Sequence, residues 1–359
     1  MIGNGGAAWG AEAGHDRSED RAATHAWVTK ALAEGEHVTE AVRLRGGWTS
    51  EMRRLRIEGP AGERAMVLRS FVRPFFVRHA PGLLSREADV LRLLGETEVP
   101  APSLVAVDAT AEHCDFPSLL MTLLPGGVRV QDEGVGRRAQ LLAEQLLRIH
   151  RVRVTEESRP RTYQPWTSAE RVTPPADGGR PGLWERAVEV IRQAPPEYQG
   201  CFLHRDFHPG NVLFTGTDTS TGTGSGTDSG TDSDSGAGTG TGTGSGTGDD
   251  LRISGVVDWV ETSWGPADLD VAHCSTTLAL LHGAPTGMRF ADLYLAAGGR
   301  LAEDPAAQLY WRLLDALAFA PDAEKVGLPW RELGRTDLTS EVLTGRLEDY
   351  LQALFDRFG

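Results

Sequence analysis

The segment CFLHRDFHPGNVLF (201–214) contains two side chains whose types and spacing suit phosphoryl transfer. Asp206 closes the tripeptide His204-Arg205-Asp206, and Asn211 follows after four further residues. Moving a phosphoryl group onto a hydroxyl requires a carboxylate that orients the hydroxyl and accepts its proton, with an oxygen ligand nearby for a divalent cation. Asp206 would be the base and Asn211 a metal ligand. Alone, an HRD tripeptide in 359 residues is more often an ordinary loop.

A second carboxylate, Asp258, supports the catalytic interpretation because it ends the apolar segment ISGVVD. Segment 215–250 separates Asp258 from Asn211, and the apolar stretches on either side of it, NVLF and LRISGVVDW, predict two short strands of a hairpin. Across that hairpin Asp258 would lie just beyond Asn211. Two oxygen ligands for a hard cation would then converge beside Asp206, which predicts a magnesium site.

The separating segment 215–250 consists only of Thr, Gly, Ser, Asp and one Ala. Without an apolar side chain it can bury nothing to offset the entropy of ordering, and Gly and Ser favour a coil. We expect a disordered loop inserted in the hairpin, since long surface insertions cost little stability.

The elements that must position these residues predict an α+β protein, with a small antiparallel-sheet lobe followed by a larger helical lobe. The expected strands lie at 37–47, 51–60, 64–72, 103–110 and 117–127, with helices at 26–35 and 83–96 among them. From the helical segment 137–150 onward, most long segments have helical periodicity. The expected organisation is a disordered N-terminus over 1–24, an N-lobe over 25–124 and a C-lobe over 125–359 that carries the catalytic and metal loops.

The stretches HRDFHPGNVLF and VVDWVETSWGPADLDVAH together resemble the aminoglycoside phosphotransferase and choline kinase-like family, which has the protein-kinase-like bilobal fold. The resemblance covers about residues 25–355. It implies ATP or GTP as phosphate donor, Mg²⁺ bridging the phosphates, and a hydroxyl of a small molecule as acceptor. It also implies that His204 and Asp270 support the catalytic loop. Asp270 could equally be a helix N-terminal carboxylate stabilised by the helix dipole.

The resemblance also implies a nucleotide site in the N-lobe. Gly46, Gly47 and Ser50, in RGGWTSEM, lie where the family has the loop that covers the phosphates, although two glycines between strands are more often only a turn. Met121 and Thr122 align with the segment that links the lobes and binds the nucleobase through its backbone. A methionine in a buried strand is more often part of a core.

Arg69, in MVLRSFV, occupies the place of the lysine that contacts the phosphates in this family. The chain has only two lysines, Lys30 and Lys325, and neither lies there. Arginine keeps the charge but not the geometry of lysine. Its partner by position is Glu87, which could otherwise be an exposed helix acid in a weak surface pair.

These features predict a Mg²⁺-dependent small-molecule kinase, a phosphotransferase with an alcohol group as acceptor. The alternative is a nucleotide-binding pseudokinase or regulatory protein without transfer activity, because Arg69 replaces the lysine. A protein kinase ranks last, since Trp259 follows the metal aspartate in place of the phenylalanine of D-F-G and no A-P-E segment is present. We expect Trp259 and Glu261 to help line the acceptor site, and His208 to pack within its loop.

Charge and composition narrow the expected partners to a nucleotide and a small molecule. The net charge is −14, and residues 261–359 carry fifteen acids and eight bases, which would suit a cationic acceptor such as an aminoglycoside. Excess surface acid more often only keeps a protein soluble. No cluster of Lys and Arg predicts nucleic-acid binding. No apolar run approaches membrane-spanning length and the first residues lack signal-peptide features, so we expect a cytoplasmic location. The three cysteines are too far apart to suggest a metal site or a disulfide framework, and no oligomeric state is predicted.

Overall fold

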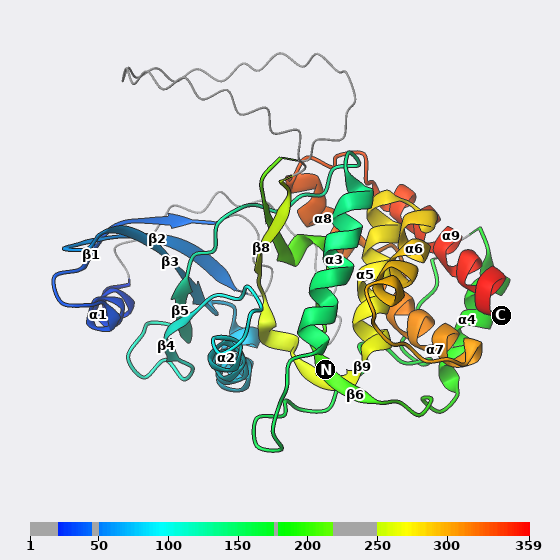
Figure 1. Ribbon diagram of the computed structural model, residues 1–359, viewed down its shortest axis with the longest axis horizontal. Helices are drawn as coiled ribbons and strands as arrows, with labels where there is room; N and C mark the ends of the chain where they lie inside the picture. The colour runs from blue at the N-terminus through cyan, green and yellow to red at the C-terminus, as the bar shows by residue number, and fades with distance from the viewer. Residues whose placement is uncertain (1–20, 45–49, 176–178, 218–249) are drawn as a thin grey trace, which may run out of the picture.

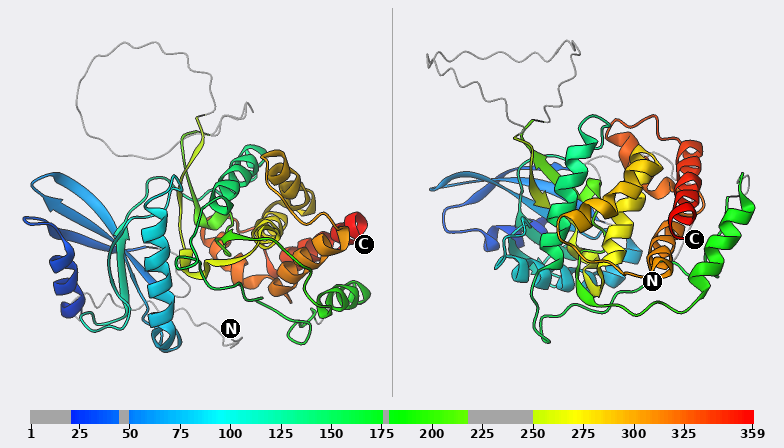
Figure 2. Two further views of the ribbon diagram at one scale, coloured as in Figure 1. Left: turned by 60° about the horizontal axis from the view of Figure 1, so that its bottom comes forward. Right: turned by 45° about the vertical axis from the view of Figure 1, so that its right-hand side comes forward.

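The computed structural model describes residues 21–44, 50–175, 179–217 and 250–359, which form two lobes (Figure 1). The small lobe is built on an antiparallel sheet and the large lobe mostly on helices, so the α+β expectation is confirmed. Figure 2 shows the sheet on one side and the helices of the large lobe on the other.

The sheet of the small lobe has five strands in the order β1-β2-β3-β5-β4, with every neighbouring pair antiparallel. All five strands expected from the sequence are present, several with shorter ends. The elements of this lobe are α1 (Ala22–Ala31), β1 (His37–Arg43), β2 (Glu51–Gly59), β3 (Gly62–Ser70), α2 (Pro74–Leu94), β4 (Leu104–Asp108) and β5 (Ser118–Thr122).

Strand β3 sends alternate side chains to opposite faces of the sheet. Met66 and Leu68 pack with α1 in one apolar cluster, whereas Val67 packs with α2 in another. Arg69 is therefore on the α2 face, where it meets Glu87. Because side chains alternate along the strand, Arg69, the one charged residue in the buried end of β3, contacts α2 and not α1.

The expectation of a disordered segment over 1–24 is wrong for its last residues. Helix α1 starts at Ala22, and the backbone N–H and the hydroxyl of Thr24 both donate to Asp115 Oδ2 at 2.8 Å. This contact ties the start of the helix to the loop before β5. The residues before Arg21 lie outside the described part of the chain.

Helix α2 begins at Pro74, nine residues before the expected start at 83. The pair Pro81-Gly82 reads as a break in the sequence, yet the helix continues through it. Ala80 and Leu84 on either side are fully buried in the core, and this packing outweighs the backbone hydrogen bond that Pro81 cannot make.

The large lobe packs its helices around α5, which lies between α3 and α9 in Figure 1. Every residue of α5 from Asp268 to Leu281 is buried. The helices are α3 (Val135–His150), α4 (Pro181–Arg192), α5 (Ala267–His282), α6 (Ala284–Ala296), α7 (Pro305–Ala316), α8 (Glu324–Glu332) and α9 (Ser340–Phe358). A helix buried on all sides holds its side chains rigidly, and α5 carries two of the polar residues of the site.

Two short antiparallel ribbons connect this bundle to the catalytic residues. The predicted hairpin is confirmed: β7 (Val212–Thr215) pairs with β8 (Arg252–Val256), and Val212 lies opposite Val256. A second ribbon, β6 (Gly200–Leu203) with β9 (Ser263–Pro266), was not predicted. The predicted loop over 215–250 lies outside the described residues from 218 to 249.

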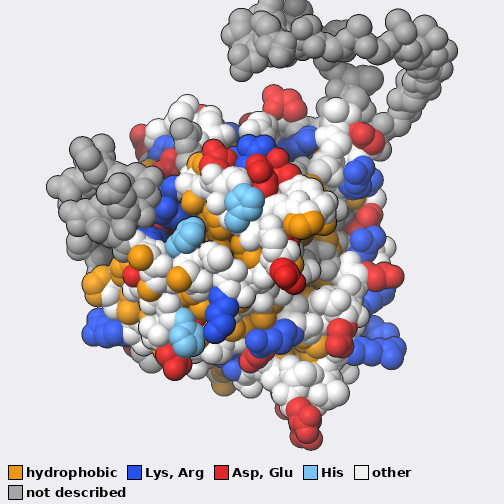
Figure 3. All heavy atoms as spheres, turned by 90° about the vertical axis from the view of Figure 1, so that its left-hand side faces the viewer, with side chains coloured by type: hydrophobic (Ala, Val, Ile, Leu, Met, Phe, Trp, Pro, Cys, Tyr) orange, Lys and Arg blue, Asp and Glu red, His pale blue; other side chains and the backbone are white. Residues whose placement is uncertain are grey.

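The surface of the small-lobe end has Lys and Arg side chains interspersed with Asp and Glu (Figure 3). Among the described residues, no helix combines the length and the apolar character needed to cross a membrane.

Candidate active site

The loop that joins β6 to β7 carries Asp206 and is called the catalytic loop after its proposed role. Asp270 of α5 holds this loop through two hydrogen bonds. The backbone N–H groups of His204 and Arg205 donate to the two carboxylate oxygens of Asp270, each at 2.8 Å. Arg205 has a φ of 72°, a strained backbone conformation for a residue other than glycine. Burial alone would raise the pKa of Asp270, but a hydrogen bond from His150 and nearby positive charge lower it. Asp270 is therefore an ionised brace.

His204 ties the catalytic loop to the strand that leads to Asp258. Its Nδ1 accepts a hydrogen bond from the backbone N–H of Asp206 at 3.2 Å, so its Nε2 carries the proton and donates to Val257 O at 3.0 Å. Burial lowers the pKa of His204, which keeps the ring neutral.

Asn211 orients Asp206. Its amide Nδ2 donates to the backbone oxygen of Asp206 at 2.9 Å and to Oδ2 of the same residue at 3.0 Å. Because the amide nitrogen is engaged, Asn211 Oδ1 remains the atom that can bind a cation. The Asp206 side chain is 31% exposed, so a substrate can reach it.

The hairpin brings Asp258 next to this pair. The backbone N–H of Val257 donates to Asn211 O at 3.0 Å, and Asp258 follows with a φ of 67°. The Asp258 side chain is 36% exposed. Two residues separated by 47 positions in the sequence, one amide and one carboxylate, are thus brought close together by the backbone contacts of the hairpin.

Arg69 reaches from β3 across the boundary between the lobes. Its Nη1 donates to both oxygens of Glu87, and its Nη2 donates to Asp258 Oδ1, all at 2.7 Å. Its Nε donates to Ser50 Oγ at 3.2 Å. Burial alone would lower the pKa of Arg69, but the two carboxylates raise it well above its ordinary value, so the guanidinium stays charged.

Glu87 is 1% exposed, so it is not the exposed helix acid that the sequence also allowed. Burial raises the pKa of its carboxyl, and Arg69 offsets only part of this effect. The sequence did not anticipate that Arg69 also contacts Asp258, 189 residues away.

The other residues predicted to bind the nucleotide in the small lobe are Gly46, Gly47, Met121 and Thr122. Gly46 and Gly47 lie outside the described residues. Met121 is a buried sheet residue packed in the core. The backbone N–H of Thr122 donates to Ser103 O at 3.0 Å, so it is not free to bind a nucleobase.

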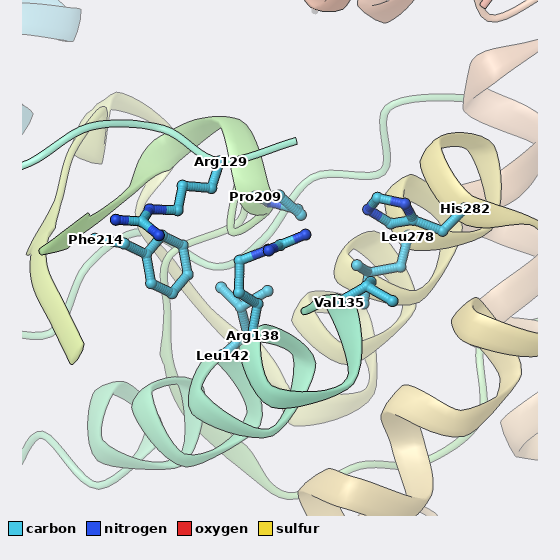
Figure 4. A pocket seen from close by; sticks show the side chains of 8 residues that line it. All are labelled: Arg129, Val135, Arg138, Leu142, Pro209, Phe214, Leu278 and His282. Atoms are coloured by element: carbon cyan, nitrogen blue, oxygen red, sulfur yellow. The ribbon is translucent and has the colours of Figure 1, made fainter. Parts of the chain in front are cut away.

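The connection between the lobes is fixed to the β7–β8 hairpin. Gly127 and Phe214 exchange two backbone hydrogen bonds, at 3.1 and 2.9 Å, and Arg129 Nη2 donates to Gly216 O. Gly126 has a φ of 97°, and a Cβ there would lie 2.5 Å from Phe214 O, so this position requires glycine. Figure 4 shows Arg129 beside Phe214, with Pro209 near them. The chain segment that links the small lobe to the large lobe is therefore hydrogen-bonded to the strand that follows Asn211.

Two residues expected to line the acceptor site do not have free side chains. Trp259 is fully buried, its Nε1 donates to Val256 O at 2.9 Å and its ring lies 4.4 Å from that of His204. Its position directly after Asp258 suggested the cleft, but the left-handed turn at Asp258 directs the indole into the core. Glu261 is paired with Arg161 at 2.7 Å.

Sequence reasoning missed the contact between Asp206 and His273 of α5. His273 Nε2 lies 3.1 Å from Asp206 Oδ1, and its Nδ1 lies 3.0 Å from Asp315 Oδ1 of α7. A signal was present, because His273 follows Asp270 by three residues and therefore shares its helix face. Asp315 lies in a helix rich in apolar residues, and no spacing in the sequence relates it to His273.

His208 completes the surroundings of Asp206. Its Nε2 lies 3.8 Å from Asp206 Oδ1, and its Nδ1 accepts from the N–H of Gly210 at 3.0 Å. Burial lowers the pKa of His208 to about 4 despite Asp206, so the ring is neutral and its proton is on Nε2.

Ligand atoms of Asp206, His208 and His273 all lie within 4.8 Å of one another, a spacing that a metal ion could use. The Nε2 of His208 carries a proton, and His273 is held between two carboxylates. We therefore assign both rings to hydrogen bonding rather than to metal binding. Asn211 and Asp258 offer the oxygen ligands that Mg²⁺ prefers.

The small antiparallel-sheet lobe and the larger helical lobe are those of the protein-kinase-like fold. The chain belongs to the phosphotransferase enzyme family, whose family model matches residues 40–223. It is thus a phosphotransferase, as the sequence predicted. A comparison with curated protein sequences gives no match.

Solved structures share the fold at low sequence identity. The amicoumacin kinase hAmiN, in complex with AMP-PNP, Ca²⁺ and Ami, has 12% identity and a TM-score of 0.55, over 94% of each chain. A thermostable mutant of aminoglycoside phosphotransferase APH(4)-Ia, with AMP-PNP and hygromycin B, has 15% identity and a TM-score of 0.54, over 92% of this chain and 98% of that one. Aminoglycoside-3'-phosphotransferase of type VIII has 19% identity and a TM-score of 0.51, over 84% and 100%. At these sequence identities, the comparisons show that the chain shares the fold of these proteins.

Proposed function

We propose that this protein is a Mg²⁺-dependent small-molecule kinase that transfers the terminal phosphate of ATP or GTP to a hydroxyl, with Asp206 as the base. The observation that carries the proposal is the position of Asn211. Its side chain donates to Asp206 Oδ2 at 3.0 Å, while its backbone oxygen accepts from Val257 next to Asp258. Base and candidate metal ligands are thus joined in one hydrogen-bonded unit.

Asn211 Oδ1 and the Asp258 carboxylate would hold the cation, whose charge would neutralise that of the transferring phosphate. Asp206 would accept the proton of the acceptor hydroxyl as the new O–P bond forms and the bond to the nucleoside diphosphate breaks. His204 and Asp270 would keep the loop that carries Asp206 in place.

Arg69 and Glu87 form the proposed phosphate-side part of the nucleotide site, together with Ser50 and the glycines 46 and 47. A phosphate oxygen would be bound through Nη2 of Arg69, because Nη1 is held by both oxygens of Glu87, and at Nη2 the phosphate would compete with Asp258. We therefore expect nucleotide and Mg²⁺ to bind together, since the cation would take Asp258 as the phosphate takes Arg69.

The acceptor would lie in front of Asp206, over the large lobe. The acidic C-terminal part of the chain supports a cationic acceptor such as an aminoglycoside. Lys325 is the one lysine in this region, with Nζ 4.6 Å from the centre of the Phe319 ring and bonded to Ala318 O at 2.8 Å. Because this region also contains a cation, Lys325, the test should include neutral and anionic hydroxyl compounds as well as cationic ones.

The test measures release of ADP or GDP with Mg²⁺ across aminoglycosides, choline-like amines, sugars, macrolides and a blank without acceptor. The control variant is Asp206→Asn, which keeps the shape of the side chain. We expect release that depends on the acceptor and is lost in the variant. Nucleotide-dependent thermal stabilisation without transfer to any acceptor would contradict the proposal.

That second outcome would favour a nucleotide-binding regulatory protein. One observation supports this candidate: in the structure, Asp258 is bound by Arg69 rather than being free for a cation. Comparing thermal stabilisation by ATP with and without Mg²⁺ separates the two, because a kinase site needs the metal to draw Asp258 away from Arg69.

A further inference from the structure

His273 connects the proposed base to a second, deeply buried carboxylate. The imidazole lies between Asp206 Oδ1, at 3.1 Å from Nε2, and Asp315 Oδ1, at 3.0 Å from Nδ1. His273 and Asp315 are each 3% exposed, and neither belongs to the catalytic loop. The three side chains come from the loop, from α5 and from α7, so the chain of contacts runs from the cleft into the core of the large lobe.

The donors and acceptors in this chain determine its charge. A neutral imidazole has one N–H and can donate to only one carboxylate, whereas an imidazolium has two and can donate to both. With both carboxylates ionised, only the charged ring satisfies Asp206 and Asp315 together. A neutral ring would leave either Asp206 Oδ1 or the buried carboxylate of Asp315 without this donor, and an unpaired buried carboxylate is strongly destabilising. This favours the charged form.

The ring of His273 is also confined by aromatic neighbours. Trp166 meets it edge-on at 4.9 Å between ring centres, and Phe319 lies nearly parallel to it at 5.7 Å. These two rings leave the imidazole little rotational freedom and exclude water, and charge–charge interactions are stronger where water is excluded. The orientation and the charge of the His273 ring are therefore both fixed before any substrate binds.

We propose that His273 is a positioning residue: a buried imidazolium, kept charged by Asp315, that fixes Asp206 Oδ1 in place to receive the acceptor hydroxyl. This inference rests on the proposed function. It adds to the site a residue outside the catalytic and metal loops. With Asn211 on Oδ2 and His273 on Oδ1, both oxygens of Asp206 have a fixed donor, while the side chain remains 31% exposed.

The ionisation of the pair agrees with this geometry. Burial alone would lower the pKa of His273, but Asp315 and Asp206 raise it to about 9. Burial alone would raise the pKa of Asp206, but the hydrogen bond from His273 and the neighbouring histidines lower it well below its ordinary range. The other titratable groups that face this chain are His204 and His208 of the catalytic loop, Lys325 of α8, Cys274 of α5 and Tyr350 of α9.

The sign of the pH effect follows from these directions. His273 is charged below about pH 9 and loses its proton above it, so kcat should fall on the alkaline side with a midpoint near 9. Asp315→Asn removes one flanking negative charge, lowers the pKa of His273 and should move this fall to lower pH. His273→Gln keeps a neutral N–H donor near Asp206 and should remove the fall altogether.

The experiment combines NMR titration of ¹⁵N-histidine-labelled protein with kcat and KM measured from pH 6 to 10. Resonances are assigned by comparison with His273→Gln. The matched control is His282→Gln, because His282 is also a histidine of α5 bonded to an aspartate, Asp132 at 2.6 Å, but lies at the far end of the helix from the site. We expect the control to keep the wild-type pH profile.

For His273→Gln we expect kcat to fall about 10- to 100-fold, as for removal of a preorganised donor or a supporting partner, with KM for the nucleotide within about twofold. A His273 ring that titrates below pH 7 in the wild-type protein would overturn the inference and leave the kinase proposal intact. An alkaline fall that persists unchanged in His273→Gln would overturn it as well. If no acceptor is phosphorylated while the ring still titrates near 9, the proposed function fails rather than the charge assignment, and the positioning role falls with it.

Discussion

Two carboxylates of the site, Asp206 and Asp258, are each held by a buried cation, but the cations come from different parts of the molecule. Asp206 is held by His273 of the same lobe, whereas Asp258 is held by Arg69 of the other lobe. The first contact is built into a rigid bundle and can titrate. The second depends on how closely the lobes approach and involves a cation that stays charged at every accessible pH. In the proposed mechanism the base is therefore held in place before substrate binds, whereas the proposed metal ligand Asp258 must exchange Arg69 for the cation.

Removing the base should have the largest effect. Asp206→Ala should lower kcat by roughly 100- to 10,000-fold, because a positioned base contributes about that much. Nucleotide binding should persist, since Arg69 and Asp258 are unchanged. The measurement is coupled release of nucleoside diphosphate, and Asp89→Ala, a change at an exposed residue of α2, is the control. Turnover within tenfold of wild type would show that Asp206 is not the base.

Breaking the contact between the lobes should mainly affect stability. Arg69→Met leaves Glu87 buried without its partner, which should cost about 3–5 kcal/mol of the free energy of unfolding. Arg56→Met breaks the Arg56–Glu63 pair, which is also 2.7 Å long but about half exposed, and should lower the free energy of unfolding far less because water screens this pair.

Thermal and denaturant unfolding of both variants measure this difference. Equal losses in the two would mean that burial of the Arg69 pair contributes nothing. Restored stability in Arg69→Lys would show that charge suffices there and that the planar head of arginine does not matter.

The pH dependence of stability should separate the two cations further. The folded-state pKa of His273, about 9, is above its unfolded value of 6.5, so its stabilising contribution is complete below pH 6.5 and is lost as the pH rises through 9. The melting temperature of the wild-type protein should therefore decrease over this range, and that of His273→Gln should decrease less. Arg69→Met should keep the wild-type slope, and the loss of that slope would mean that the two cations are coupled.

The smallest effect should come from deleting residues 218–248. Thr217 donates to Asp250 Oδ1 through its N–H at 2.6 Å and through its hydroxyl at 2.8 Å, which closes the end of the hairpin on its own. We expect turnover within a few-fold of wild type. A loss of magnesium affinity would show that the deleted residues act on Asp258 after all.

Local patterns made part of this arrangement predictable. The strand alternation, the periodicity of the helices and the hairpin depend on neighbours in sequence, and so does the spacing from Asp206 to Asn211. The contacts of Arg69 with Asp258 and of His273 with Asp206 join residues 189 and 67 positions apart, and no local pattern specifies them. The start of α2 at Pro74 was missed for a related reason, because tertiary packing outweighs the local signal of Pro81-Gly82.

The hydrogen bonds between Thr217 and Asp250 have a consequence for engineering the chain. They bring together the two points from which residues 218–249 depart, at the tip of the β7–β8 hairpin. A guest domain with its own ends close together, such as a fluorescent reporter, could be spliced in at this tip. Because β8 runs from there directly to Asp258, the reporter would be attached to the strand that carries the metal ligand.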